Sequence, residues 1–266
     1  MQAVRLGVIG CGNMGAAITR ALVEKKILQS ETILINDKDM DKLRKLGEST
    51  GVSVASLDEL MARSNMLLFA VKPQDFGTVA GTVKGKISGH MVLSIMAGIR
   101  MAGIKEALGG DIPVVRAMPN MAASVQESMT CLSFSGMETL PVEVKNIFGA
   151  IGEVMVLEEG LLDTVTAMSG SGPAYLFYLA DAMISAGEKN GLSRERSEML
   201  VRQTLLGAVV LLNQTTVGAA ELIRAVASKG GTTEAALTIM DKAGLKDVVE
   251  NAISAAKKRS EELSAG

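Results

Sequence analysis

The feature that most constrains the fold lies at the start of the chain, where a short apolar run breaks into three glycines at fixed spacing. Residues 4–9 are typical of a buried strand, and the residues from Ala16 onward are typical of a helix. Between them the chain reads Gly-x-Gly-x-x-Gly, from Gly10 to Gly15. A strand, a glycine turn and a helix in this order form the phosphate-binding unit of dinucleotide-binding domains.

Each glycine of this turn has a separate role in such a unit. Gly10 permits the tight turn, Gly12 lets the backbone approach a pyrophosphate, and Gly15 lets the helix pack against the strand. The backbone N–H groups at the start of the helix bind the anion. A second apolar strand at residues 32–36 follows at the required distance, so the sequence predicts nucleotide binding rather than an incidental glycine turn.

Short β-rich runs alternate with helical stretches as far as about residue 157, which predicts an α/β fold with a doubly wound, mostly parallel sheet. We expect strands near residues 4–9, 32–36, 52–54, 66–71, 91–96, 113–118, 129–134 and 153–157. Beyond residue 160 we expect helices only, at 161–168, 173–190, 193–213, 218–228, 232–243 and 245–263. The chain thus divides into a Rossmann-type dinucleotide-binding domain, 1–159, and an all-α domain, 160–266.

Two of the expected helices, 173–190 and 193–213, carry apolar side chains on more than one face. A helix that is apolar nearly all round must be buried, and a domain of this size cannot bury both helices alone. We therefore expect a second copy of the chain to cover them in a homodimer, which makes the all-α part a dimerisation and substrate-binding domain. A compact monomeric bundle is the alternative.

Composition argues against several classes of function. A formal net charge of −2 leaves no basic excess for nucleic acid or an anionic membrane, and the apolar stretches are too short to span a bilayer. Two cysteines and one histidine cannot form the usual four-ligand zinc site, and they disfavour a Ser-His-Asp triad. The first residues leave no room for a secretion signal. We expect a soluble, cytoplasmic protein without a metal site.

The residues after the second strand lie where a dinucleotide domain meets the adenine ribose. A carboxylate such as Asp37 accepts hydrogen bonds from the ribose hydroxyls and repels a 2′-phosphate, whereas a lysine such as Lys38 pairs with that phosphate. Asp37 favours NADH, and Lys38 leaves NADPH open. Either residue alone is also compatible with a solvated turn.

Two more loops follow the fourth and fifth expected strands, whose carboxyl ends face the ligand in open sheets. The first loop contains Lys72 and Pro73, and the second contains Ala97. We expect both loops to line the cofactor groove. Lys72 is a structural residue, a cofactor contact or a general acid, in that order of preference.

In the helical part, residues 228–231, Ser-Lys-Gly-Gly, separate two helices, and we call them the Gly-Gly loop. Two glycines before a helix expose consecutive N–H groups, and the helix dipole adds partial positive charge, so the loop suits a small carboxylate. Thr232 and Thr233 add hydroxyls that can contact an imine. A capped Gly-Gly turn is the alternative, but a second loop of small residues, from Ser169 to Tyr175, favours a substrate site.

These segments contain no histidine–acid dyad. Reduction of a ketone needs a general acid near the developing alkoxide. A protonated cyclic imine is already cationic and accepts hydride to give a neutral amine. A cofactor groove, a carboxylate-binding loop and hydroxyls therefore suit an imine better than a ketone.

Taken in order and spacing, five motifs resemble those of pyrroline-5-carboxylate reductase over essentially the whole chain. They run from Gly10 to Gly15, Ala70 to Gln74, Arg116 to Asn120, Ser169 to Tyr175 and Gly230 to Thr233, and the last two are specific to this family. The resemblance implies an oxidoreductase that reduces L-1-pyrroline-5-carboxylate to L-proline with NADPH or NADH, the last step of proline biosynthesis. It also implies a homodimer and leaves a larger ring of dimers open.

The resemblance assigns roles residue by residue. Ser228 and Thr233 are the catalytic candidates, with the Thr233 hydroxyl near the ring nitrogen. The substrate would be bound by Glu159, Gly230, Gly231, Thr232 and Thr233. The cofactor would be bound by Gly10, Gly12, Asn13, Met14, Gly15, Asn36, Asp37, Ala70, Val71, Lys72, Pro73 and Ala97. The active site would combine the groove of one chain with the Gly-Gly loop of its partner.

The chain departs from the family pattern at Lys229, where the family usually has proline, and around Ala219 and Arg224. These departures leave a related cyclic imino acid open as the substrate. A β-hydroxyacid dehydrogenase-like enzyme is a second hypothesis, although residues 169–187 contain no lysine where those enzymes use one. A non-catalytic dinucleotide-binding protein is a third, and the intact Gly-Gly loop disfavours it.

Overall fold

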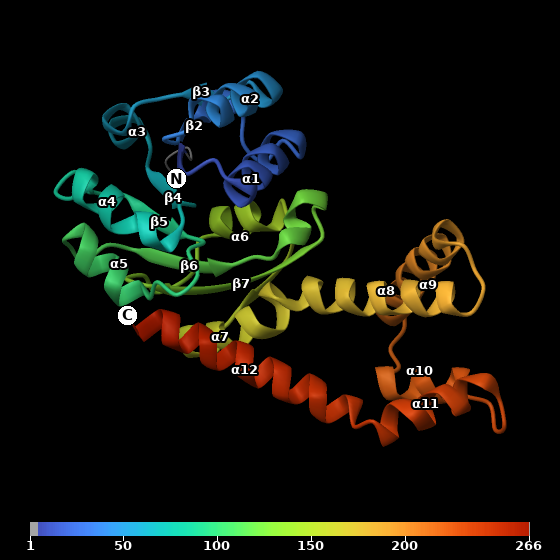
Figure 1. Ribbon diagram of the computed structural model, residues 1–266. Coiled ribbons are helices and arrows are strands. Elements are labelled where there is room, and N and C mark those ends of the chain that lie inside the picture. Colours follow the sequence, from blue (N-terminus) through green and yellow to red (C-terminus); the bar gives the residue numbers. More distant parts are fainter. Residues whose placement is uncertain (1–4, 266) are drawn as a thin grey trace. The chain divides into compact units, whose positions relative to one another are not determined.

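The computed structural model describes residues 5–265, which form two compact units (Figure 1). The first unit runs to Ser171 and also includes the chain from Ala256 onward, and the second unit is Gly172–Ala255. Residue 4 of the expected first strand lies outside the described residues. So do most of the residues on which the absence of a secretion signal was judged.

The first unit contains one sheet, and its strands match the eight runs expected from the sequence. They are β1 (Leu6–Ile9), β2 (Ile33–Asn36), β3 (Ser53–Val54), β4 (Met66–Phe69), β5 (Met91–Ser94), β6 (Val114–Met118), β7 (Ser128–Ser135) and β8 (Gly152–Val156). Their order in the sheet is β3-β2-β1-β4-β5-β6-β7-β8. Among these described strands only β6 and β7 pair antiparallel, which confirms a mostly parallel sheet. From β1 the chain adds β2 and β3 on one side and β4 and the later strands on the other. Open sheets bind ligands at such a switch point, here between β1 and β4.

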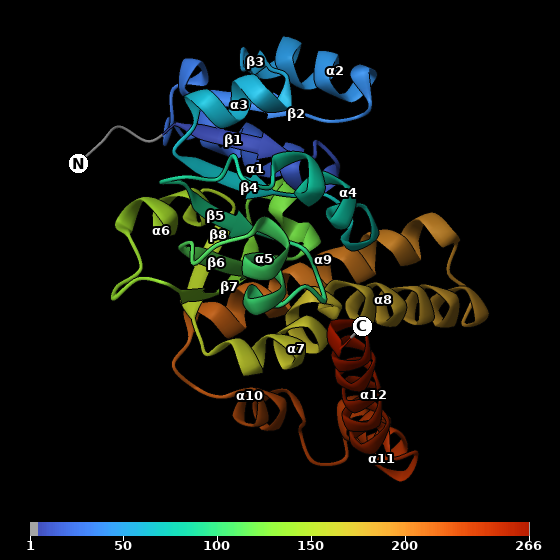
Figure 2. The ribbon, with the colours of Figure 1, turned by 90° about the vertical axis from the view of Figure 1, so that its left-hand side faces the viewer.

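Helices cover both faces of this sheet, as a doubly wound fold requires (Figures 1 and 2). One apolar core includes side chains of α1 (Asn13–Glu24), α2 (Met40–Thr50) and α6 (Val142–Gly149). The other includes side chains of α3 (Leu57–Arg63), α4 (Pro73–Val83) and α5 (Met101–Leu108). Each strand from β1 to β5 is therefore followed by a helix that buries one face of the sheet.

After β8 the chain passes through a 3₁₀ turn (Glu159–Leu161), α7 (Leu162–Val165) and a π-helical turn (Thr166–Gly170). The expected helix at 161–168 is thus divided, and the expected loop of small residues begins inside the π-helical turn. A β-carbon on Gly170 would lie 2.8 Å from Met118 Cε, the end of a flexible side chain that could move aside.

The second unit consists of helices within its described residues. They are α8 (Gly172–Lys189), α9 (Arg194–Gln214), α10 (Ala219–Val226), α11 (Thr232–Lys242) and the larger part of α12 (Leu245–Ala265). The end of the helix expected at 173–190 and the start of the one expected at 193–213 agree with the structure to within one residue. Gly191 has a φ of +94° after α8, and the Ser193 hydroxyl accepts a hydrogen bond from the Arg196 N–H at 3.3 Å. Across residues 5–265 no helix is both long and apolar enough to cross a membrane.

Helices α8 and α9 leave large apolar side chains uncovered in the single chain. Phe177 is 59% exposed, Tyr178 is 81% exposed, and Leu206 and Leu211 are more than half exposed. Monomeric proteins rarely leave so much contiguous apolar surface in water. The exposure agrees with the expectation that a second copy covers these helices.

The two compact units divide elsewhere than at the expected domain boundary of 159/160. The turns after residue 159 pack on β7, and the end of α12 contacts α7, so both segments fall within the first unit. The 159/160 boundary marks where strand-forming sequence stops. It stays a prediction about domain organisation.

Candidate functional site

A groove of about 460 Å³ lies at the carboxyl ends of β1, β2 and β4 in the first unit. Its lining includes many of the predicted cofactor contacts, namely Gly10, Gly12, Asn36, Asp37, Ala70, Val71 and Lys72. These residues come from three separate segments of sequence. The groove lies at the switch point of the sheet, where dinucleotides bind in folds of this type.

The three glycines of the turn differ in what surrounds them. Gly10 has a φ of +103°, and a β-carbon there would lie 2.7 Å from the Ala70 carbonyl. A β-carbon on Gly15 would overlap the Gly10 carbonyl oxygen. At Gly12, by contrast, nothing lies within 4 Å of an added β-carbon. The protein itself requires Gly10 and Gly15, whereas the open space at Gly12 fits a ligand that approaches the backbone closely.

Asp37 joins the glycine turn to the end of β2. Its Oδ2 accepts a hydrogen bond from the Cys11 N–H at 2.6 Å, and its Oδ1 accepts one from the Asp39 N–H at 2.9 Å. A carboxylate has further lone pairs for the hydroxyls of a ribose. Lys38 and Lys42 also line the groove, and Lys38 Nζ lies 3.1 Å from Asp75 Oδ2. Both signs of charge therefore border the expected ribose position.

We predict that Asp37→Ser raises the ratio of kcat/KM with NADPH to kcat/KM with NADH by about tenfold, or ~1.4 kcal/mol. The substitution removes the charge that repels a 2′-phosphate and keeps a small polar side chain. Steady-state kinetics with both dinucleotides measures the ratio. Met40→Ser is a control, because Met40 is exposed in the next turn and is not part of the groove lining. An unchanged ratio in Asp37→Ser would show that Asp37 does not set the cofactor preference and would point to Lys38 or Lys42.

Other predicted cofactor residues lie outside the lining of the groove. Met14 packs against an apolar core, Pro73 begins α4, and Ala97 is exposed in the turn after β5. Asn13 and Gly15 occupy the first turn of α1, where backbone N–H groups have no intrahelical acceptor. The roles of these residues stay predictions.

The sequence analysis missed Lys42, Asp75 and Thr78, which the structure places in the lining of the groove. Lys42 lies in the first turn of α2, and the other two lie in the first turns of α4. Both helices begin after strands whose carboxyl ends form the groove. Their position one turn beyond a strand end was the signal that could have identified them.

Cys11 is a structural residue rather than a reactive thiol. Its side chain is buried, and burial together with the nearby Asp37 carboxylate raises the pKa of the thiol to about 12. The thiol therefore stays protonated near neutral pH. His90 is buried at the start of β5, where Nδ1 accepts a hydrogen bond from the Ser88 N–H at 3.1 Å and Nε2 lies 2.9 Å from the Met61 carbonyl oxygen. It supports the fold there.

The Gly-Gly loop, in the second unit, uses the N–H groups of both glycines internally. Gly231 N donates to the Ser228 carbonyl oxygen at 3.0 Å, and Gly230 N donates to Glu234 Oε2 at 2.6 Å. Thr232 and Thr233 begin α11, where N–H groups have no intrahelical acceptor. The donors best placed for a substrate carboxylate are therefore the backbone N–H groups of the two threonines. Gly230, with a φ of +73°, shapes the turn.

Thr233 also lies at an apolar hollow of about 320 Å³ between α9, α10 and α11. Leu211, Val226 and Leu237 line the same hollow. A hydroxyl at the edge of apolar side chains can orient one polar atom of a small ring while the rest of the ring contacts carbon. Ser228 is exposed, and its carbonyl oxygen closes the turn.

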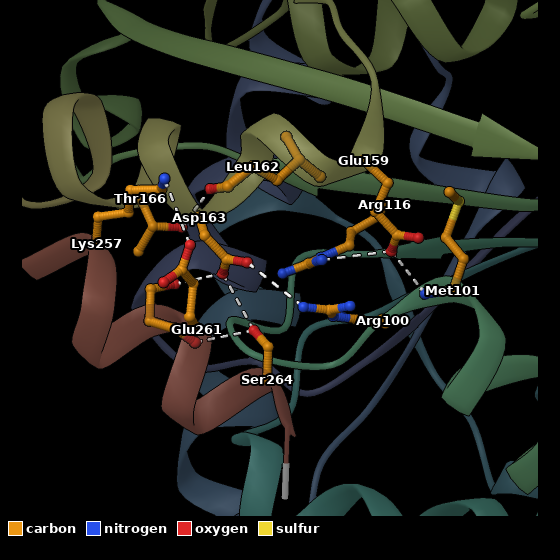
Figure 3. Close-up of polar contacts among 11 residues, drawn as sticks. Arg100, Met101, Arg116, Glu159, Leu162, Asp163, Thr166, Lys257, Glu261 and Ser264 are labelled. Atoms are coloured by element: carbon orange, nitrogen blue, oxygen red, sulfur yellow. Dashed lines mark hydrogen bonds and ion pairs between the residues drawn. The ribbon is translucent and has the colours of Figure 1, made fainter.

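Glu159 is held by donors of the first unit (Figure 3). Its Oε1 accepts hydrogen bonds from the Met101 N–H at 2.7 Å and from Arg116 Nη1 at 3.3 Å. The Arg116 side chain is only 3% exposed, whereas that of Glu159 is 25% exposed. One carboxylate oxygen of Glu159 is thus fixed by protein donors, and the predicted contact with substrate would use the other.

Comparisons with known proteins cover up to 99% of the chain. Residues 159–263 match the family model described as pyrroline-5-carboxylate reductase dimerisation, and residues 5–98 match one described as NADP oxidoreductase, coenzyme F420-dependent. A pyrroline-5-carboxylate reductase of Methanosarcina acetivorans is 34% identical over 268 residues, which cover 99% of each chain. One from Arabidopsis thaliana is 35% identical over 267 residues, which cover 99% of this chain and 96% of the relative.

Solved structures agree with these matches. A pyrroline-5-carboxylate reductase of Coxiella burnetii superposes with a TM-score of 0.91 at 32% identity, with 99% of each chain covered. A pyrroline carboxylate reductase of Plasmodium falciparum, solved with NADP bound, gives a TM-score of 0.88 at 29% identity, again over 99% of each chain. These findings confirm the predicted fold, the reductase activity and the use of NAD(P)H, and the helical part corresponds to the dimerisation region of the family. The chain belongs to the pyrroline-5-carboxylate reductase family.

Proposed function

We propose that this chain reduces L-1-pyrroline-5-carboxylate to L-proline with NADPH or NADH, as the last step of proline biosynthesis in the cytoplasm. The observation that supports this most directly is the groove at the switch point of the sheet, where Gly12 leaves open space beside Asp37. The family relationship supports the choice of substrate. The departure at Lys229 keeps a related cyclic imino acid as the second candidate.

The groove residues bind and orient the cofactor, which supplies a hydride when bound. Backbone N–H groups at the start of α1 would hold the pyrophosphate, since a helix N-terminus favours an anion and Gly12 leaves open space there. Asp37 would accept hydrogen bonds from the ribose. Lys72 borders the same groove with a positive charge.

The substrate residues position the ring and need not transfer a proton before the hydride arrives. The first N–H groups of α11, on Thr232 and Thr233, bind the substrate carboxylate, and the Thr233 hydroxyl contacts the ring nitrogen. A protonated imine is neutralised when its carbon accepts hydride, so no histidine or acid is required at that step. This explains why a site built of backbone N–H groups and hydroxyls is sufficient.

The homodimer completes the site in this proposal. The groove of one protomer and the Gly-Gly loop of its partner act on one substrate, and the exposed apolar faces of α8 and α9 meet their copies. Sedimentation equilibrium distinguishes a dimer from a ring of dimers. A monomer at micromolar concentration would contradict this arrangement.

We predict that Thr233→Ala lowers kcat by about tenfold, the effect of losing one hydrogen bond of ~1.4 kcal/mol in the transition state. The dissociation constant of the dinucleotide stays unchanged, because the groove lies in the other unit. Thr238→Ala is a matched control on the exposed side of α11. If Thr233→Ala turned over at the rate of the unsubstituted protein, Thr233 would have no part in the reaction.

The substrate class is tested by the rate of NADH and NADPH oxidation with 1-pyrroline-5-carboxylate, a six-membered cyclic imino acid and a β-keto acid. We expect turnover with the five-membered imine, slower turnover with the six-membered ring, and none with the keto acid. Turnover of the keto acid alone would favour a hydroxyacid dehydrogenase. Dinucleotide binding without turnover of any of the three would favour a non-catalytic protein.

A further inference from the structure

The end of α12 belongs to the first unit although the rest of that helix lies in the second. Residues 256–265, which we call the C-terminal segment, contact α7 and the loop after β5 (Figure 3). That loop, residues 95–100, contains Ala97, one of the predicted cofactor contacts. The C-terminal segment therefore lies beside a loop that is predicted to contact the cofactor.

Asp163 holds the C-terminal segment. Its side chain is buried, and Oδ1 accepts a hydrogen bond from Ser260 Oγ at 2.6 Å. Oδ1 also lies 3.1 Å from Ser264 Oγ, whose proton it shares with the Ser260 carbonyl oxygen at 2.9 Å. A buried carboxylate is costly unless it is hydrogen-bonded, and bonds to a charged acceptor are stronger than neutral ones. Asp163 is therefore a fixed attachment point for the last turns of α12.

The loop after β5 and the first residue of α5 lie close to neighbouring segments at three places. At Gly98, whose φ is +75°, a β-carbon would lie 3.0 Å from the Leu263 carbonyl oxygen. Arg100 Nη2 lies 4.0 Å from Asp163 Oδ2, and the next residue, Met101, donates its N–H to Glu159. The C-terminal segment and Asp163 thus lie against the loop after β5. This loop follows the carboxyl end of a central strand, and the ligand of an open sheet binds at such strand ends.

We propose that Asp163 and Ser260 are positioning residues, which fix the loop of Ala97 for the dinucleotide by holding the C-terminal segment against Gly98. The inference rests on the proposed function, since it assumes that the groove binds NAD(P)H and that the predicted contact of Ala97, outside the groove lining, meets the bound dinucleotide. Neither residue lines the groove, so each acts through the loop and the helix end. When the Ser260–Asp163 hydrogen bond is lost, the C-terminal segment separates from Gly98 and the loop becomes more mobile. Dinucleotide binding must then order the loop, which weakens the affinity.

The test is a titration of the purified full-length protein with NADH, followed by the fluorescence of the dinucleotide, since the chain has no tryptophan to interfere. Ser260→Ala is expected to raise the dissociation constant about fivefold, and Ser264→Ala, which loses the longer bond, about twofold. Asp163→Ala is expected to raise it more than Ser260→Ala. Asp163→Asn, which keeps an oxygen acceptor for both hydroxyls, recovers most of the lost affinity.

Glu262→Gln is the matched control, because it removes an exposed ion pair with Arg259 from the same turn and leaves the Asp163 contacts in place. Melting temperatures are measured in parallel. If Ser260→Ala and Ser264→Ala lower the melting temperature but bind NADH as tightly as the unsubstituted protein, the cluster only stabilises the fold and the proposal is overturned. If the unsubstituted protein binds neither dinucleotide, the proposed function itself fails, and the two failures are thus distinguishable.

Discussion

Gly12→Val is expected to abolish dinucleotide binding while the protein remains folded. Nothing lies within 4 Å of an added β-carbon at this position, and the φ of −68° is one that valine adopts readily. The new side chain would occupy the space that a pyrophosphate needs. We expect the dissociation constant for NADH to rise at least about a hundredfold, or ~2.7 kcal/mol, and the free energy of unfolding to change by less than about 1 kcal/mol.

Fluorescence titration with NADH and urea denaturation measure the two quantities on the same preparation. The combination matters, because loss of binding in an unfolded protein would say nothing about the groove. A folded Gly12→Val protein that binds NADH normally would show that the pyrophosphate does not approach this turn.

Gly15→Ala, unlike Gly12→Val, is expected to destabilise the fold. We expect its free energy of unfolding to be lower by about 3 kcal/mol. Gly15 lies within α1, where alanine normally stabilises a helix relative to glycine by ~1 kcal/mol. Here the added β-carbon would overlap the backbone oxygen of Gly10, so packing outweighs helix propensity and the sign reverses. Urea denaturation measures the change.

Gly77→Ala is the matched control for Gly15→Ala. Gly77 also lies within a helix, α4, but nothing lies within 4 Å of a β-carbon there. We expect the control to gain about 0.5–1 kcal/mol of stability from propensity alone. Equal stabilisation by both substitutions would contradict the close approach of α1 to the glycine turn.

Local patterns allowed most of the fold to be predicted from the sequence. Each of the eight strands lies within or beside the expected residues, because buried parallel strands are continuous apolar runs bounded by turns. The adjoining ends of the helices expected at 173–190 and 193–213 were also predicted to within one residue, and in the structure Gly191 and Ser193 cap them. The groove could be placed because the ends of parallel strands meet at one edge of the sheet.

Contacts between residues far apart in the sequence could not be predicted. The hydrogen bond of Ser260 to Asp163 joins residues 97 positions apart, and nothing in the periodicity of α12 indicates that its last turns leave the helical unit. Hydrogen bonds within the Gly-Gly loop could not be predicted either. The Gly-Gly pattern suggested two exposed N–H groups, but Glu234 and the Ser228 carbonyl oxygen already accept them.

The most informative measurement is the amount of L-proline formed per NAD(P)H oxidised when the purified protein acts on L-1-pyrroline-5-carboxylate. One proline per dinucleotide is the predicted result, and Gly12→Val should form none. Dinucleotide oxidation without proline, or proline formed equally well by Gly12→Val, would contradict hydride transfer to the imine from a cofactor bound in this groove.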